Sequence, residues 1–195
     1  MKLQIQKSTS ETDLVKGCKR QKAKAQRMLY EKYAPTMLGL CRRYVRGEQE
    51  AEDVMINGFM KVFSKIDLFE GKGSFEGWMK RIMINESLGY IRKNKAMYLE
   101  TDIEAADKEP DLDKLSTALE TKDLLKMINE LPSGYRTIFN LYAIEGYSHK
   151  EIGELLGINE NTSKSQLSRA RMQLQKKLLE TERVLEKQNI IRDGK

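Results

Sequence analysis

The sequence predicts an all-α protein of two helical domains joined by an acidic flexible linker. Only 3 of the 195 residues are Pro and 13 are Gly, so residues that break helices are scarce. Apolar residues recur at three- and four-residue spacing in both halves of the chain. Between the halves, residues 97–126 carry 9 acidic and 4 basic side chains, with too few apolar residues to cover a core. The predicted divisions are a first domain over 10–95, a linker over 96–116, a second domain over 117–182 and a C-terminal tail over 183–195.

Composition also limits the function classes. The net charge of +6 and a pI near 9.1 favour a polyanionic partner. Cys18 and Cys41 stand singly within helical patterns, without the spacing of metal ligands, which suits a reducing cytoplasm and predicts neither a disulfide nor a metal site. No run of eighteen apolar residues occurs, and residues 1–10 lack a signal-peptide core. We therefore expect a cytoplasmic protein without membrane insertion and without a cofactor.

In the first domain, helical spacing predicts a helix over 25–45, with Pro35 marking a boundary or a kink. Two further apolar stripes follow, one beginning at Met55 and the other at Phe75. Between them, residues 67–74 contain Gly71, Lys72 and Gly73 and are predicted to form a loop. One Gly-x-Gly without a preceding strand is weak support for a phosphate cradle, so no nucleotide site is predicted.

The second domain shows the layout of a helix-turn-helix. Leu131-Pro132 predicts a helix entry, and residues 145–147 predict a turn. Ser148-His149-Lys150-Glu151 has the form of a capping box that opens a short helix, which Gly157 ends. Asn159 can cap the next helix, whose inward residues are predicted to be Leu167, Ala170, Leu174 and Leu178. A helix, a short glycine turn and a second helix form the DNA-binding layout.

The outward side of this last helix carries hydrogen-bonding and basic residues. The sequence places there Lys164, Ser165, Gln166, Ser168, Arg169 and Arg171. Such side chains clamp phosphates and read base edges. The small residues Asn161, Thr162 and Ser163 are expected to let the helix start approach a DNA backbone. A basic helix considered alone is more often plain solvated surface, but the capped helix and glycine turn in front of it favour DNA binding.

No enzyme is predicted. His149 is the single histidine, expected as an exposed polar residue in a first turn, and the sequence shows no neighbours that would make a catalytic triad with it.

Two motif sets resemble those of one protein family. Residues 131–136, 145–152 and 164–171 look like region 4 of the sigma-70 family of RNA polymerase sigma factors. Ala51-Glu52-Asp53-Val54 resembles region 2.2, and residues 73–79 with 81–85 resemble regions 2.3 and 2.4. Because only regions 2 and 4 are present, with a short linker, the chain resembles the extracytoplasmic-function (ECF) group of these bacterial proteins.

The resemblance implies a set of partners and roles. Region 2.2 of the family docks on the clamp helices of the polymerase beta-prime subunit, and Asp53 matches its acidic contact. Ile56 and Asn57 replace the usual Gln-Glu pair. In the family, a pocket in region 2 holds a base flipped out of the promoter's minus-ten element. The residues here that match positions at this pocket are Phe69, Lys72 and Asn85. Region 4 of the family reads the promoter's minus-thirty-five element in the major groove. The resemblance assigns this contact to Thr162, Lys164, Ser165, Gln166, Ser168 and Arg169. The beta flap and an anti-sigma factor are further expected partners.

Three functions of different classes follow. The first is a dissociable polymerase subunit that confers promoter specificity. The second is a stand-alone helix-turn-helix regulator that never joins polymerase, and the third is a helical adaptor for an acidic protein. For Phe69 and Trp78, the plain interpretation is that they are core aromatics, and we favour it for Trp78.

Overall fold

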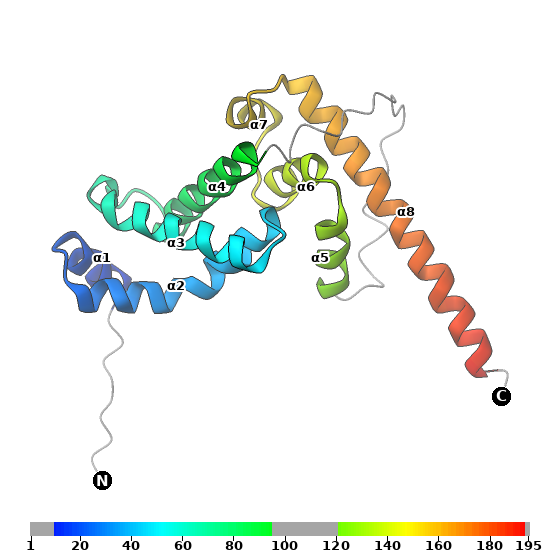
Figure 1. The fold of residues 1–195 in the computed structure, drawn as a ribbon, viewed down its shortest axis with the longest axis horizontal. Coiled ribbons are helices and arrows are strands. Elements are labelled where there is room, and N and C mark those ends of the chain that lie inside the picture. The colour runs from blue at the N-terminus through cyan, green and yellow to red at the C-terminus, as the bar shows by residue number, and fades with distance from the viewer. Residues whose placement is uncertain (1–9, 95–120, 194–195) are drawn as a thin grey trace, which may run out of the picture. The chain divides into compact units, whose positions relative to one another are not determined.

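The computed structural model describes residues 10–94 and 121–193, and all regular structure within these ranges is helical (Figure 1). The chain divides into two compact units, Met1–Lys93 and Asn94–Lys195. The all-α prediction is therefore confirmed. The linker predicted at 96–116 lies outside the described residues.

Unit 1 is a bundle in which α2 (Ala23–Tyr44), α3 (Glu48–Ser64) and α4 (Phe75–Lys93) pack on one another. The first helix, α1 (Glu11–Lys19), packs on α2 and on a short 3-10 turn, η1 (Ile66–Leu68). The two apolar stripes predicted from Met55 and Phe75 face the interior, and their first residues are 4% and 1% exposed. Unit 1 therefore owes its bundle to the periodicity visible in the sequence.

Pro35 does not mark a helix boundary, because α2 continues through it. Its ring lies on the exposed side of the helix. Water can therefore satisfy the carbonyl of Glu31, which loses its usual amide partner at this position.

Unit 2 contains α5 (Thr121–Glu130), α6 (Ser133–Phe139), α7 (His149–Leu156) and α8 (Glu160–Asp193). A π-helical turn, η2 (Asn140–Ile144), follows α6 directly. The four residues predicted to face inward from α8 are all buried, together with Leu131, Ile138, Leu141 and Ile152. The helix runs on to Asp193, so α8 includes residues 183–193 of the predicted C-terminal tail.

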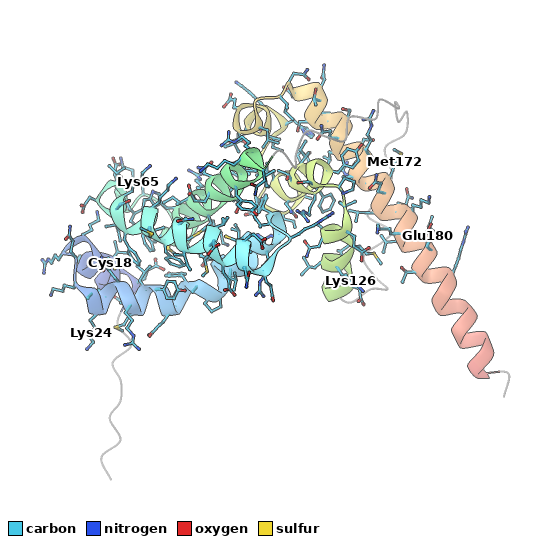
Figure 2. The ribbon with its side chains drawn as sticks, viewed as in Figure 1. Cys18, Lys24, Lys65, Lys126, Met172 and Glu180 are labelled. Carbon is cyan, nitrogen blue, oxygen red and sulfur yellow. The ribbon has the colours of Figure 1, made fainter. Side chains whose placement is uncertain are left out.

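Polar contacts attach α5 to the rest of unit 2. Arg136 is 3% exposed, and its Nη1 donates to the carbonyl of Asn129, 3.1 Å away, near the end of α5. Lys177 of α8 lies 2.6 Å from Glu130, and this ammonium lowers the pKa of the carboxyl group. Lys126 and Glu180 help to line a cleft of about 400 Å³ between α5 and α8 (Figure 2).

Candidate nucleic-acid interface

The helix-turn-helix is built from local capping contacts. Ser148 Oγ accepts a hydrogen bond from Glu151 N, and Glu151 Oε2 accepts one from Ser148 N at 2.8 Å, so the predicted capping box is present. Gly157 ends α7 with φ at 69°, a conformation that costs glycine little. Asn159 Oδ1 accepts from Thr162 N at 2.7 Å and caps α8. These three predictions are confirmed.

Gly153 sets how closely the turn folds back on α7. A Cβ atom at this position would lie 2.7 Å from the carbonyl oxygen of Ile158. The amides of Gly157 and Ile158 both donate to the Gly153 carbonyl, at 2.9 and 3.1 Å. Gly153 was not among the predicted residues, although a glycine four positions before the turn glycine was a usable signal.

A polar contact across the motif overturns two expectations. The His149 ring is half-buried and stacks on Tyr142 with 4.4 Å between ring centres. Its Nδ1 lies 2.9 Å from Ser163 Oγ. Ser163 is fully buried, because it stands four residues before Leu167 on the inward stripe of α8. His149 is therefore not an exposed residue, and Ser163 cannot line a DNA-facing helix start.

The outward face of α8 divides into exposed and half-buried positions. Lys164 and Ser165 are exposed, whereas Gln166, Ser168 and Arg169 are half-buried. The Lys164 ammonium lies 2.7 Å from Glu160 and lowers the pKa of that carboxyl group through a hydrogen bond and its charge. The exposed residues at the start of this face also include Asn161, which the sequence analysis left out of the base-reading set.

Several hydroxyl and guanidinium groups of this face have partners within the unit. The Thr162 hydroxyl donates to Asn159 Oδ1 at 3.0 Å, and Ser165 Oγ donates to the Thr162 carbonyl at 3.1 Å. Arg171 is half-buried, with its guanidinium carbon 5.9 Å from the centre of the Tyr142 ring. Among the described atoms, the Ser168 hydroxyl is buried and has no hydrogen-bond partner. Lys164 and Ser165 are thus the predicted readers most open to a ligand.

In unit 1, Phe69 belongs to an aromatic cluster. Its ring lies edge-on to Phe75, with centres 5.0 Å apart, and 5.6 Å from the ring centre of Trp78. Phe75 is buried, whereas Phe69 and Trp78 are half-buried. Neither Phe69 nor Trp78 is fully buried, so each residue keeps some surface that a ligand can reach. A half-buried aromatic pair of this kind can stack an unpaired base.

The loop after Phe69 combines two left-handed glycines with an exposed cation. Gly71 and Gly73 have φ values of 77° and 88°. Lys72 stands between them, with its ammonium 2.6 Å from the exposed carboxylate of Glu70. Asn85 is exposed on α4, seven residues after Trp78 and so on the same side of the helix two turns further along.

The predicted polymerase-docking residues share one exposed face of α3. Asp53, Ile56 and Asn57 are all exposed, at three- and four-residue spacing, and Ile56 is 47% exposed. Met60 continues this face and is 65% exposed. Met60 was not among the predicted docking residues, although its position seven residues after Asp53 gave the signal. We call Asp53, Ile56, Asn57 and Met60 the α3 strip.

Other chemistry finds little support in the described part of the chain. Neither range contains a cluster of His, Cys, Asp and Glu that could hold a metal ion. None of the helices described is long and apolar enough to cross a membrane. Cys18 and Cys41 are buried free thiols, and burial raises the pKa of Cys41 to about 11.

These features define a helical DNA-binding protein with a helix-turn-helix unit and a second, separate helical unit. The family model for sigma-70 region 2 matches residues 29–97, and that for sigma-70 region 4 matches residues 121–174. The chain belongs to the sigma-70 family of RNA polymerase sigma factors, in its ECF group. Neither matching model indicates a catalytic family.

Two curated relatives agree with this assignment, and one solved structure is also similar to the chain. The ECF RNA polymerase sigma factor SigW of Bacillus subtilis is 32% identical over 160 residues, which span 75% of this chain and 84% of that protein. The ECF RNA polymerase sigma-E factor of Haemophilus influenzae is 29% identical over 168 residues, covering 80% of this chain and 88% of the relative. The sigma factor RpoE of Bartonella quintana, solved with the anti-sigma factor NepR, is 26% identical with a TM-score of 0.49, over 79% of this chain and 96% of that one.

Proposed function

We propose that this sigma factor binds core RNA polymerase through the α3 strip and reads promoter DNA with both of its units. The observation that carries the proposal is the pairing of a helix-turn-helix with a second helical unit that displays an exposed acidic and apolar strip. A stand-alone helix-turn-helix regulator has no need for that strip. The chain carries out no bond chemistry in this proposal, and it acts in the cytoplasm, where bacterial polymerase works.

In unit 2, α8 enters the major groove at the minus-thirty-five element. The exposed Lys164 and Ser165 lie in the first two turns of the helix, the part of a recognition helix that meets the DNA. Thr162, Gln166 and Arg169 complete the contact surface. The Ser168 hydroxyl is buried, so Ser168, which the sequence placed among the base readers, does not take part. A DNA phosphate competes with Glu160 for the ammonium of Lys164, because both partners of this ion pair are exposed.

In unit 1, a base flipped from the minus-ten element stacks on the half-buried rings of Phe69 and Trp78. Asn85 offers an amide that reads the edge of the base, and Lys72 holds a neighbouring phosphate. Stacking on an aromatic is worth about 1–3 kcal/mol per base. Unpairing costs a few kcal/mol, so capture of one base can bring strand opening close to balance.

The partners follow from these surfaces and from the family. The α3 strip docks on the clamp helices of the beta-prime subunit, with Asp53 as its acidic contact and Ile56 and Met60 as its apolar ones. Unit 2 meets the beta flap. An anti-sigma factor is a further expected partner, which would cover these surfaces when the factor is inactive.

The test is copurification with core polymerase, followed by run-off transcription from a genomic library. We expect discrete start sites only when the chain is added. Phe69→Ala and Asn85→Ala should reduce permanganate reactivity of the minus-ten thymines while leaving closed-complex affinity at fixed salt nearly unchanged. A chain that binds duplex DNA but never copurifies with polymerase would instead be a stand-alone regulator.

A further inference from the structure

Lys19, the last residue of α1, is bonded to the loop that carries Phe69. Its ammonium donates to the carbonyl oxygen of Phe69 at 2.8 Å and lies 3.5 Å from that of Asp67. The bond to Phe69 is partly buried, and the two residues are fifty positions apart in the chain. In the part of the protein that the structure describes, Lys19 makes no ion pair with a carboxylate. Its charge is therefore directed at the main chain of η1 and the loop.

This contact lies where η1 ends and two left-handed glycines follow. Phe69 ends η1 with its amide donating to the Ile66 carbonyl at 3.1 Å. The left-handed Gly71 and Gly73 follow within four residues, and a Cβ at either would meet nothing within 4 Å. A side chain at either glycine would therefore meet open space, and glycine adopts these φ values at little cost. Phe69 precedes both glycines, its amide is bonded to η1, and Lys19 holds its carbonyl.

We propose that Lys19 is a positioning residue for base capture. It fixes the main chain of Phe69, so that the ring presents a stacking face beside Trp78 before DNA arrives. A rigid stacking platform lowers the ordering cost of binding a flexible strand. The inference rests on the proposed role of Phe69 in the minus-ten site. It adds a residue from α1 that touches no base itself.

The chain offers an internal reporter for this geometry. Trp78 is the single tryptophan, and its ring centre lies 5.6 Å from that of Phe69. Its fluorescence therefore responds to the position of the Phe69 ring in the free protein and to a base stacked beside it. Figure 2 labels Cys18, the residue before Lys19, on α1.

The experiment compares Lys19→Met, Lys19→Arg and Lys16→Met in the full chain. Lys16→Met is the matched control, since it removes an exposed cation from the same helix that makes no bond to the loop. The first readout is Trp78 emission of the free proteins. We expect Lys19→Met to change emission intensity and wavelength, and Lys16→Met and Lys19→Arg to leave both near the wild-type values.

The second readout is a titration with a single-stranded minus-ten oligonucleotide, in which quenching of Trp78 fluorescence measures binding. We expect Lys19→Met to weaken binding by about tenfold, as loss of a charge-assisted bond allows, and the other two variants by no more than about twofold. In the polymerase complex, Lys19→Met should lower the permanganate reactivity of the minus-ten thymines more than Lys19→Arg or Lys16→Met does. Binding to minus-thirty-five duplex should be equal in all variants.

The two ideas fail in different ways. If wild-type chain does not bind the oligonucleotide, the capture role of Phe69 is wrong, while Trp78 emission of the free variants still decides whether Lys19 holds the ring. If the wild type binds and Lys19→Met behaves like Lys16→Met in both readouts, Lys19 does not position Phe69. If Lys19→Arg is as weak as Lys19→Met, the cationic donor is not what the loop requires, and the inference is overturned.

Discussion

At the scale of single residues, the α8 surface mixes side chains that are open to a ligand with others that are held inside unit 2. Lys164 and Ser165 are exposed, whereas Arg169 is half-buried. The Thr162 hydroxyl donates a hydrogen bond to the capping residue Asn159. A half-buried base reader is held in one orientation by its neighbours, and that favours specificity over non-specific attraction. An exposed lysine contributes mainly phosphate attraction.

We therefore expect different results from Arg169→Ala and Lys164→Ala. Loss of a bidentate base contact should cost about 1–3 kcal/mol and relax preference at one position, whereas loss of a phosphate contact weakens all sequences alike. Arg169→Ala should show the first pattern and Lys164→Ala the second. Binding to a set of single-base variants of the minus-thirty-five element measures both. If neither substitution changes affinity or preference, the reading face is elsewhere on the unit.

For the Glu160–Lys164 ion pair, we predict a substitution that raises DNA affinity instead of lowering it. Removing the carboxylate frees the Lys164 ammonium and takes a negative charge away from the approaching phosphates. Glu160→Gln should raise affinity for minus-thirty-five duplex by a few-fold and make it fall more steeply with salt. A matched control is Glu180→Gln, an exposed carboxylate further along α8. Equal affinities of Glu160→Gln and wild type across the salt series would contradict this account.

At the scale of elements, the turn between α7 and α8 depends on Gly153. A Cβ there meets backbone, at 2.7 Å from the Ile158 oxygen, so the turn must shift to accept it. We expect Gly153→Ala to destabilise unit 2 by about 1–3 kcal/mol. Gly89→Ala in α4 is the control, because nothing lies within 4 Å of its Cβ and helix propensity should make it neutral or stabilising. Denaturant unfolding of both variants measures the difference, and a Gly153→Ala midpoint equal to that of wild type would show that the turn tolerates the methyl group.

The local elements could be predicted from the sequence because their causes are local. Ser148 and Glu151 cap each other across three residues, and Gly157 ends α7 through its own backbone preference. The apolar stripes of α3, α4 and α8 follow from helical spacing alone. In contrast, the burial of Ser163 and the stacking of His149 on Tyr142 depend on how α7, η2 and α8 meet, which spacing does not reveal.

In the candidate site, too, some features could be predicted from the sequence, whereas others depend on how the helices pack. The family resemblance pointed to Asp53, Ile56 and Asn57 as docking positions, and they are exposed on one face. It could not predict that Lys19 would bond the Phe69 carbonyl across fifty residues, since that contact exists only once α1 packs on η1. The roles of all these residues in binding remain predictions.

At the scale of the whole molecule, the proposal assigns polymerase docking and duplex reading to different units. Ile56→Glu places a charge in the α3 strip at an exposed position, so unit 1 should stay folded. We expect it to abolish copurification with core polymerase and run-off transcription, and to leave minus-thirty-five duplex binding by the free chain unchanged. Thr36→Glu, which adds the same charge at an exposed site on α2, should leave all three intact. Equal transcription by the two variants would remove the α3 strip from the docking surface.

The uninterrupted course of α8 also has a mechanical consequence. Its 34 residues make a rod about 51 Å long, whose first turns lie at the proposed reading face and whose far end is Asp193 (Figure 1). A helix of this length amplifies small rotations, because tilting it by about 10° about its reading end displaces the far end by roughly 9 Å. A dye attached near Asp193 would convert small changes in the seating of α8 on different promoters into distances that energy transfer resolves.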